Sequence, residues 1–377
     1  MSDRSDAAIT TLIEPWMADR RPIIDAAIEK YFPRAVDEKK LEFICGPPSF
    51  RYDVAAANYG IYTPGWELLD RGGKRWRPLL MMLVMEALGQ DPRTFGDFLV
   101  IPEVVHNGTL IIDDIEDRSE LRRNGPCIHR IVDPTTGEPK YGVDLAINAG
   151  NTMYYVPLLP LIKLRERLPP EVLIDIYEIY AQEMINISHG QGTDLYWHHG
   201  KEHNLGVDQY LQMCAYKTGT LARMSARIGA RLAGADGYMT SVLGKFAESI
   251  AVAFQIQDDV LNLQASVGKE FAEDIKEGKR SLLVIRALTQ LPRSYGTRLE
   301  QILDMHTGDR ELTEEAIALI KRTDAFDYCR RMSLQLIEKS WAGLEGRLSQ
   351  YSPYIGFSRD ARSGLRALAD FLIARSH

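Results

Sequence analysis

The amino-acid sequence predicts an all-α protein whose main body is a single domain. Two long segments, 98–115 and 246–263, repeat apolar residues at helical spacing, which places these residues on one side of a helix. Glycine and proline break the helical pattern, for example at 46–48 and 126–143. We find no convincing run of alternating apolar and polar residues, the pattern of strands, and no internal repeat in the 377 residues.

The composition is that of an ordinary soluble globular protein, with 45% hydrophobic and 26% charged residues. The net charge of −7 argues against a broad surface for nucleic acid or anionic membranes but permits a local basic pocket. The four cysteines are widely spaced without a CxxC pair, which indicates a reducing compartment. The N-terminus lacks the features of a signal peptide, and no segment reaches about 20 uninterrupted apolar residues. We therefore expect a cytoplasmic protein without a membrane span.

Residues 1–70 are expected to form a helical extension that packs on the main domain, which spans 71–377. Apolar residues at helical spacing predict a helix from Ala7 to Tyr31 in this extension. The sequence Gly46-Pro47-Pro48 marks the loop that follows. No residue of this part indicates a particular chemistry.

The main domain opens with a glycine pair and three cations, GGKRWRP (72–78), directly before an apolar helix expected from Leu79 to Leu88. Free backbone N–H groups at a helix start, the helix dipole and the side chains of Lys74, Arg75 and Arg77 all favour an anion there. A solvated basic surface is the alternative, and this motif alone does not decide between them.

The first acidic motif lies in HNGTLIIDDIEDRSELRRNGP (106–126), where an apolar helix runs into Asp113, Asp114 and Asp117. Residues four apart share a helix face, so Asp113 and Asp117 are expected to point the same way with Asp114 beside them. Neighbouring carboxylates repel each other and favour a cation, and a few carboxylates with further positions left to water or phosphate suit Mg²⁺. A solvated acidic face is the alternative.

A second acidic motif, FQIQDDVLNL (254–263), favours the metal site. Its polar residues Gln255, Asp258, Asp259 and Asn262 follow the i, i+3, i+4, i+7 spacing of one helical stripe. If the two acidic helices face each other, their carboxylates form a site for magnesium.

Two further helices are expected at Asp144–Leu164 and Pro170–His189. A chain reversal is expected at Gly190–Gly192. Gln191 and Asp194 lie near this reversal and are either capping groups or pocket groups.

More cations follow in the second half of the chain. The sequence YKTGT (216–220) is expected to open a helix, and it offers Lys217 and Thr218 either to a phosphate or as capping groups. The polar segment 264–280 supplies Lys269, Lys276, Lys279 and Arg280 directly after the second acidic motif. From Ser281 onward the pattern is again helical.

Together, these motifs indicate a substrate that carries a diphosphate and an apolar tail. Acids would hold magnesium, cations would hold phosphate, and apolar helices would surround the tail. Magnesium bound to both carboxylates and diphosphate promotes cleavage of the C–O bond, and a dry pocket protects the allylic cation that forms. The sequence has no defensible Ser/His/Asp triad, P-loop or dinucleotide-binding fingerprint.

From about Gly72 to the C-terminus, the chain resembles the trans-isoprenyl diphosphate synthase (polyprenyl synthetase) family. The motifs that carry the resemblance follow one another as GGKRWRP, HNGTLIIDDIEDRSELRRNGP, AINAGNTMYY, GQGTDLYW, YKTGT, FQIQDDVLNL and KEFAEDIKEGKRS. The resemblance implies an all-α bundle around a deep central cavity, usually a homodimer. It also implies that residues 71–377 form a catalytic domain that joins isopentenyl diphosphate to an allylic diphosphate head to tail. Within the family, the chain resembles geranylgeranyl diphosphate synthases of the eukaryotic type.

The resemblance implies a role for each candidate site residue. About three magnesium ions per active site would be held by Asp113, Asp117 and Asp258, with Asp114 and Asp259 in support. The allylic diphosphate would be held by Arg122, Lys217, Gln255 and Lys269, with Thr218 and Lys279 as further members. Isopentenyl diphosphate would be held by Lys74, Arg77, His106 and Arg123. For a lone histidine a structural role is the commoner one, but His106 lies on the acidic face of its helix.

Two features depart from the family pattern. The second acidic motif reads DDVLN rather than the commoner DDxxD, and Asn262 can still act as an oxygen ligand or a hydrogen-bond partner. The loop 126–143 is longer than the usual link in the family, and we assign it no function.

The resemblance also implies that product length depends on the side chains along the helix below the first acidic motif. Gly108 and Thr109 are small and lie roughly 6 to 7.5 Å before Asp113, so a floor for a fifteen-carbon product is absent there. Tyr154 and Tyr155 on the next helix are expected to form a deeper floor, which favours a twenty-carbon product. Ordinary core packing is the alternative for this aromatic pair.

Other functions stay open at this point. They are a farnesyl or longer-chain product, irregular prenyl coupling on the same scaffold, and a non-catalytic partner subunit. A partner subunit should have eroded motifs, whereas both acidic motifs and the cations are intact here. A class I terpene cyclase would have a different second metal motif and would lack GGKRWRP and Lys217.

Overall fold

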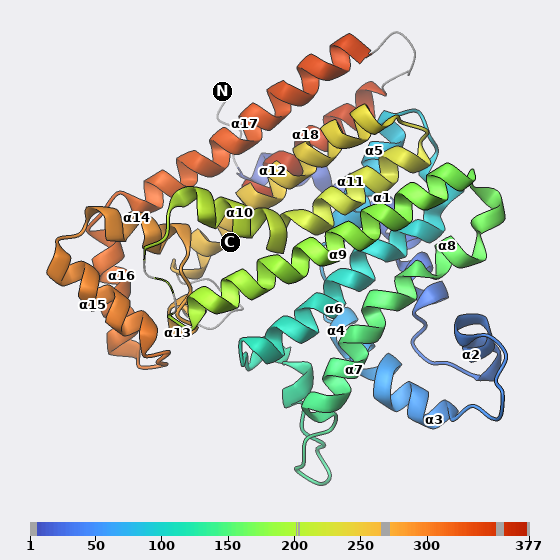
Figure 1. Cartoon of the computed structure of the whole chain (residues 1–377), viewed down its shortest axis with the longest axis horizontal. Coiled ribbons are helices and arrows are strands. Elements are labelled where there is room, and N and C mark those ends of the chain that lie inside the picture. Colours follow the sequence, from blue (N-terminus) through green and yellow to red (C-terminus); the bar gives the residue numbers. More distant parts are fainter. Residues whose placement is uncertain (1–5, 201, 203, 265–271, 352–357, 375–377) are drawn as a thin grey trace.

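The computed structural model describes residues 6–200, 202, 204–264, 272–351 and 358–374. These residues confirm the all-α fold, and their strands are limited to the short hairpin β1 (Leu121–Arg122) and β2 (Gly125–Pro126). Figure 1 shows the long helices packed side by side. The longer helices are α1 (Asp6–Tyr31), α5 (Trp76–Ala87), α6 (Val100–Glu116), α7 (Gly142–Tyr155), α9 (Pro170–His198), α10 (Val207–Lys217), α11 (Gly219–Leu232), α12 (Gly237–Asn262), α15 (Arg293–Asp304), α16 (Arg310–Lys321), α17 (Ala325–Tyr351) and α18 (Arg359–Ile373). The shorter ones are α2 (Glu38–Cys45), α3 (Val54–Ala57), η1 (Asn58–Tyr62), α4 (Thr63–Leu69), η2 (Pro92–Leu99), η3 (Ile128–Arg130), η4 (Val156–Leu158), α8 (Leu159–Lys163), η5 (Arg165–Arg167), α13 (Glu273–Lys276) and α14 (Leu282–Gln290).

The centre of the bundle is formed by α11 and α12, which pack along each other. The long helix α17 packs on α12, while α5 and α9 pack on α11. All side chains of α5 from Leu79 to Met85 are buried, so this helix is apolar on every side. Gly229 of α11 lets α5 approach closely, because a Cβ atom there would lie 2.8 Å from the carbonyl oxygen of Met81.

A pair of glycines also brings α6 and α7 together. A Cβ atom on Gly108 would lie 2.8 Å from the carbonyl oxygen of Gly150 and 3.2 Å from the ring of Tyr154. The first acidic motif is at the C-terminal end of α6. The close contact therefore places α7 beside the helix that carries these acids.

Helix α9 does not end at His189, and the expected chain reversal at Gly190–Gly192 is wrong. The helix continues to His198, and Gln191 and Asp194 lie within it. Gly190 serves helix packing instead, because a Cβ atom there would collide with the backbone of Lys217 at the end of α10. A glycine inside a helix permits such a close approach of another segment. The sequence pattern does not distinguish a glycine in this role from a glycine that ends a helix.

Two other helix boundaries differ from the expected ones. The helix expected at Asp144–Leu164 is divided into α7, η4 and α8, with Pro157 at the break, where proline removes a backbone N–H donor. The sequence YKTGT lies at a junction, since α10 ends at Lys217 and α11 begins at Gly219. Lys217 therefore stands at the end of a helix and not at the start of one.

The N-terminal helix α1 packs on α5, on η2 and on the C-terminal helix α18. Arg20 of α1 donates hydrogen bonds to the carboxylate of Glu86, with an N–O distance of 2.9 Å. The separation of residues 1–70 from the rest as a domain of their own stays a prediction.

The loop 126–143 contains η3 and an isolated antiparallel bridge between Val132 and Pro139. It is attached to α4 through Glu67, which accepts hydrogen bonds from Lys140 at 2.8 Å and from the Tyr141 hydroxyl at 3.2 Å. The loop is thus fixed at its C-terminal end by a cluster of charged and phenolic groups.

Among the described residues, one stretch, Pro92–Glu116, is long and apolar enough by composition to cross a membrane. In the protein, 61% of its most apolar window is buried. A buried core helix has the same length and composition, so the stretch is only weak support for a membrane span.

Candidate active site

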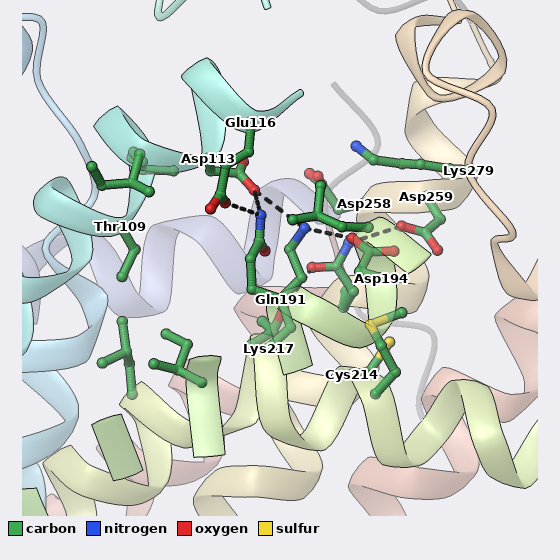
Figure 2. A pocket seen from close by; sticks show the side chains of 18 of the residues that line it. Thr109, Asp113, Glu116, Gln191, Asp194, Cys214, Lys217, Asp258, Asp259 and Lys279 are labelled. Atoms are coloured by element: carbon green, nitrogen blue, oxygen red, sulfur yellow. Dashed lines mark hydrogen bonds and ion pairs between the residues drawn. The ribbon is translucent and has the colours of Figure 1, made fainter. Parts of the chain in front are cut away.

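A cavity of about 470 Å³ lies between α6, α9, α10 and α12. Acidic and basic side chains gather at one end, as Figure 2 shows for Asp113, Lys217 and Asp258. Thr109 lies farther along the cavity, away from these charges. The apolar part of the lining includes Leu110, Ile112, Met184, Ile187, Leu221 and Phe254. The cavity therefore has a charged end and an apolar end.

Asp113 of α6 is surrounded by hydrogen-bond donors. Lys217 Nζ lies 3.2 Å from its Oδ1, Arg122 Nη2 lies 3.5 Å from its Oδ2, and Gln191 Nε2 donates to Oδ1 at 2.9 Å. Burial alone would raise the pKa of Asp113, but the charges of Lys217 and Arg122 lower it below its usual range. Asp113 is therefore held as a carboxylate that faces the cavity.

Asp194 of α9 is a member of the site that sequence reasoning left undecided. Lys217 Nζ lies 2.5 Å from its Oδ2, and His198 Nε2 lies 2.9 Å from its Oδ1. Burial raises the pKa of Asp194, yet the charges of Lys217 and His198 together lower it. Lys217 thus bridges Asp113 and Asp194, one from each of two helices (Figure 2). In the sequence, the helical spacing of Gln191 and Asp194 indicated that they share a helix face. The chain reversal expected at Gly190–Gly192 hid this signal.

The other two acids of the first motif do not share the environment of Asp113. Asp114 is buried and paired with Arg122, whose Nη2 lies 2.5 Å from its Oδ1. Asp117 follows the last residue of α6 and lines a neighbouring hollow of about 420 Å³, where His198 Nδ1 lies 3.8 Å from its Oδ1. Burial and the negative charge of Asp113 raise the pKa of Asp117. Asp114, expected beside the other two in a supporting role, thus contacts Arg122. Asp117 was expected to point the same way as Asp113, and this expectation is wrong, because Asp117 lines the neighbouring hollow.

The second acidic motif faces the first from α12. Gln255, Asp258 and Asp259 all line the cavity (Figure 2 labels both aspartates). Gln255 Nε2 donates to Asp259 Oδ1 at 2.8 Å, and the hydroxyl of Tyr210 donates to Asp259 Oδ2 at 2.6 Å. The hydroxyl of Thr218 donates to Gln255 Oε1 at 2.8 Å. A chain of hydrogen bonds therefore orients Asp259 from both sides.

Asn262, which stands in place of the commoner acid, has a contact of its own. Its Oδ1 accepts a hydrogen bond from the backbone N–H of Asp274 at 3.1 Å. Asp274 belongs to α13, the short helix that precedes Lys279 in the chain. The amide therefore holds this later segment against α12.

Lys279 also reaches the charged end of the cavity (Figure 2). Its Nζ lies 3.1 Å from Asp274 and 2.6 Å from Glu277. Burial lowers the pKa of Lys279, but the charges of Asp274 and Glu277 raise it well above its usual value. Lys269, also expected in the site, lies outside the described residues.

The basic residues of the expected second diphosphate site form a corner beside the cavity. Arg77 and His106 line the cavity, and Arg123 packs behind them, where it donates to the carbonyl oxygen of Gly72 at 2.6 Å. Burial, followed by the charges of Arg77 and Arg123, lowers the pKa of His106 well below its usual value. Lys74 is exposed and does not line the cavity; its Nζ lies 4.6 Å from the ring centre of Phe371.

The four residues proposed for the floor occupy different places. Thr109 and Tyr154 line the cavity, and Gly108 lies in the contact between α6 and α7. Tyr155 is wrong as a floor residue, because 70% of it is exposed on the outer face of α7. Adjacent helix residues point about 100° apart, so only one of the two tyrosines can face the cavity.

The acids at the charged end fit a magnesium ion by their chemistry. Asp113 and Asp258 offer hard oxygen ligands to the same cavity. Asp117 Oδ1 is buried and has no hydrogen-bond partner among the described residues, as expected for an oxygen that a cation would satisfy. Within the described residues, no three His, Cys, Asp or Glu side chains already form a metal cluster. Water and phosphate would therefore have to complete the coordination.

The known proteins that are similar to this chain include prenyl-chain synthases. The family model described as polyprenyl synthetase matches residues 59–320. A geranylgeranyl pyrophosphate synthase from Geoglobus acetivorans is 32% identical over 320 residues, which cover 84% of this chain and 92% of that protein. A geranylfarnesyl diphosphate synthase from Natronomonas pharaonis is 28% identical over 384 residues, which cover 97% and 98%.

The fold agrees with these relatives. The crystal structure of a geranylgeranyl pyrophosphate synthetase from Pyrococcus horikoshii matches with a TM-score of 0.76 and 26% identity, over 97% of this chain and 99% of that one. The relatives named here are archaeal, so the expected likeness to the eukaryotic type is not confirmed. With a family model that covers most of the chain and a relative above 30% identity, the chain belongs to the polyprenyl synthetase family of trans-isoprenyl diphosphate synthases, and it is a prenyltransferase that elongates prenyl chains.

Proposed function

We propose that the enzyme condenses isopentenyl diphosphate with an allylic diphosphate head to tail in the presence of Mg²⁺, with geranylgeranyl diphosphate as the main product. The observation that carries this proposal is the polarity of the cavity. Helices α6, α9 and α12 bring acids to one end, where Lys217 contacts Asp113 and Asp194, and the other end is apolar. This arrangement matches a substrate with a diphosphate head and a hydrocarbon tail.

The allylic diphosphate is assigned to the charged end between α6 and α12. Asp113, Asp117 and Asp258 would hold about three magnesium ions, which neutralise the diphosphate and promote its departure. Asp114 and Asp259 support these ligands through their pairs with Arg122 and Tyr210. The diphosphate oxygens are assigned to Arg122, Lys217, Thr218, Gln255, Lys269 and Lys279.

Isopentenyl diphosphate is assigned to the basic corner made by Arg77, His106 and Arg123, with the exposed Lys74 as a fourth group that would have to turn toward it. The depressed pKa of His106 makes its ring neutral, so it would donate a single hydrogen bond to a phosphate oxygen. Arg77 and Arg123 supply the positive charge. The apolar lining excludes water from the reacting carbons, which protects the allylic cation and strengthens the charge interactions.

Tyr154 is proposed as the floor that limits chain growth. Its ring lines the cavity below the acids and lies near Gly108, where α6 and α7 touch. A twenty-carbon product follows if the tail ends at this ring. The names of the relatives indicate products of two different lengths. In this enzyme, the position of the floor along the cavity decides which of these lengths is made.

The enzyme is proposed to work as a cytoplasmic homodimer. The outer faces of α7 and α9 expose apolar side chains: Val143, Ile147, Tyr155, Ile174, Tyr177, Ile185 and Tyr196. On α9 these residues, together with the exposed Ala181, Ser188 and Gly192, repeat every three or four positions, so they form one stripe along the helix. An exposed apolar stripe of this length is typical of a protein interface, and a second copy would bury it.

The test is an incubation of the purified protein with Mg²⁺, isopentenyl diphosphate and each of the five-, ten- and fifteen-carbon allylic diphosphates. The products are dephosphorylated and sized by chromatography, with EDTA as the control for magnesium. We expect a dominant twenty-carbon alcohol that disappears with EDTA. A longer ladder of products would contradict the Tyr154 floor. A folded protein that elongates no primer would contradict the proposed function.

A further inference from the structure

Behind the basic corner, three buried side chains and the half-buried Arg123 connect two turns of the chain that are distant in sequence. Arg75 Nη1 donates to Glu103 Oε1 at 2.6 Å, and Asn107 Nδ2 donates to the same oxygen at 3.0 Å. Asn107 Oδ1 in turn accepts from Arg123 Nη1 at 3.0 Å. Arg123 Nη1 also donates to the carbonyl oxygen of Gly72 at 2.6 Å. The network begins and ends in the glycine-rich turn 72–75.

Three members of this network are shielded from solvent. Asn107 and Glu103 have exposed fractions of 0% and 2%, and Arg75 has 6%. In such surroundings a hydrogen bond is stronger than in water, and leaving one partner unpaired is costly. Glu103 would be an uncompensated buried charge without Arg75. The network therefore permits few alternative arrangements.

The backbone of both turns also depends on these contacts. Arg75 and Arg123 each have a φ of 51°, in the left-handed region that side chains with a Cβ rarely adopt. The two turns touch, because a Cβ atom on Gly73 would lie 3.2 Å from Arg123 Nη2. Strained turns persist only where the surroundings fix them, and the network supplies this fixation.

Asparagine suits position 107 because it uses both ends of its amide. Its Nδ2 donates to the carboxylate of Glu103, while its Oδ1 accepts from Arg123. An aspartate there would place a second carboxylate 3.0 Å from Glu103, and an apolar residue would leave Arg123 without this contact. The side-chain amide of Asn107 thus connects the ion pair of Arg75 and Glu103 to Arg123.

We propose that Asn107 and Glu103 are positioning residues for isopentenyl diphosphate, which hold Arg123 and the turn 72–75 in the geometry that binds its diphosphate. Neither residue lines the cavity, so each acts through the cations that it holds. This inference rests on the proposed function of the basic corner.

The first test replaces Asn107 by alanine and compares the Michaelis constants of the two substrates. We expect KM for isopentenyl diphosphate to rise about tenfold or more, as for the loss of a hydrogen bond to a charged group. KM for the allylic diphosphate, whose site is formed by other residues, should stay within about twofold of wild type.

The matched control is Asn58→Ala. Asn58 is half-buried and makes three side-chain hydrogen bonds to the backbone of Val36 and Val54, in the N-terminal part of the chain. Its loss should lower the melting temperature without changing KM for isopentenyl diphosphate. If Asn107→Ala lowered only the melting temperature in the same way, the residue would be merely structural and the proposal would be wrong.

The second test is a charge exchange between the two positions. Asn107→Asp alone places two carboxylates together and should raise KM for isopentenyl diphosphate more than Asn107→Ala. The double variant Glu103→Gln with Asn107→Asp restores one amide and one carboxylate, so it should recover much of the affinity. Equal KM values in the single and the double variant would overturn the proposal. If wild type itself elongated no primer, the proposed function would have failed instead.

Discussion

At the scale of single residues, the charged end of the cavity is defined by Lys217, which lies between Asp113 and Asp194. Asp194 is buried, and the side chains of Lys217 and Asp113 are only about one-fifth exposed, so each charge depends on its neighbours. Burial lowers the pKa of Lys217, but the negative charges of Asp113 and Asp194 raise it beyond its usual value. The lysine therefore stays positive where a diphosphate is expected.

The first prediction concerns Asp194→Asn, a replacement of nearly the same shape. Lys217 would lose the closer of its two carboxylate contacts, at 2.5 Å, and would no longer be held toward α9. We expect kcat/KM for the allylic diphosphate to fall by about 10- to 100-fold, as for a broken buried charge pair. Steady-state kinetics check this result. An unchanged kcat/KM would mean that Asp113 alone positions Lys217.

The second prediction concerns Asn262, whose side chain accepts the N–H of Asp274. Asn262→Asp keeps an oxygen at this place, so we expect kcat/KM within about threefold of wild type. Asn262→Ala leaves the N–H of Asp274 unpaired, which costs about 1–3 kcal/mol of local stability, and activity should fall further. Hydrogen exchange of α13 together with kinetics distinguishes the two variants. Equal exchange rates would contradict the anchoring role.

The residue types at the site could be predicted from the sequence better than their directions. Spacing alone paired Asp113 with Asp117, but α6 ends between them and Asp117 turns toward a separate hollow. The adjacent tyrosines 154 and 155 were likewise indistinguishable until the orientation of α7 was known. Periodicity gives the relative angle of two residues, and only tertiary packing decides which of them faces the cavity.

At the scale of elements, helix contacts made by glycine decide where the charged groups meet. Gly190 of α9 lies directly against the backbone of Lys217. The sequence could not separate this role from a helix end, because glycine is common in both places. In contrast, the long helices α1 and α6 were predicted closely, since their apolar residues keep one period over many turns, whereas the predicted segment 246–263 missed the first nine residues of α12.

The third prediction follows from this contact. Gly190→Ala adds a methyl group where the backbone of α10 lies, so α9 and α10 must separate and carry Asp194 away from Lys217. We expect a loss of about 1–3 kcal/mol in stability and a marked loss of activity, measured by thermal unfolding and by kinetics. Gly343→Ala is the matched control, because Gly343 lies within α17 with open space around it. It should be neutral or slightly stabilising.

The fourth prediction concerns the attachment of the loop 126–143 to α4. Burial raises the pKa of Glu67, but the hydrogen bond and charge of Lys140 dominate and lower it below its usual value of 4.5. A lowered folded-state pKa contributes stability above pH 4.5, and this contribution is lost as the pH falls through the folded-state value. Because Glu67 is about one-third exposed, the effect should be below about 1 kcal/mol.

Wild type and Glu67→Gln therefore should differ in unfolding free energy near neutral pH and converge in acid. Denaturant unfolding at several pH values between 3 and 7 measures this difference. A gap that stayed constant with pH would show that the carboxylate contributes through packing and not through its charge.

At the scale of the whole molecule, the bundle isolates its cavity by surrounding it with α6, α9, α10 and α12. The core helices α11 and α12 are covered by α5, α9 and α17, whereas the outer sides of α7 and α9 remain uncovered in one chain. The all-α class and the family could both be predicted from the sequence, because motifs in a fixed order imply the fold that carries them. The uncovered faces of α7 and α9 could not be predicted from the sequence, since the exposure of their side chains depends on how the helices pack in the folded protein.

The fifth prediction tests these faces. Ile185→Glu places a charge in the middle of the exposed stripe on α9, where 53% of Ile185 is accessible. We expect the dimer to dissociate, because an unpaired charge in an apolar interface is strongly unfavourable. Leu334→Glu is the control, since Leu334 is also exposed, at 41%, but lies on α17. Light scattering after size-exclusion chromatography measures the mass of each variant. Equal masses would contradict the assignment of the interface.

Helix α9 carries two sets of side chains in one stretch of chain. Asp194 on its inner side contacts Lys217, and Ile185 and Tyr196 lie on its outer side. One inserted or deleted residue would rotate everything beyond it by about 100° and would misplace both sets at once. Insertions and deletions in relatives should therefore be absent from α9 and occur in loops such as 126–143. During evolution, the length of this helix would then be preserved more strictly than the identity of most residues in it.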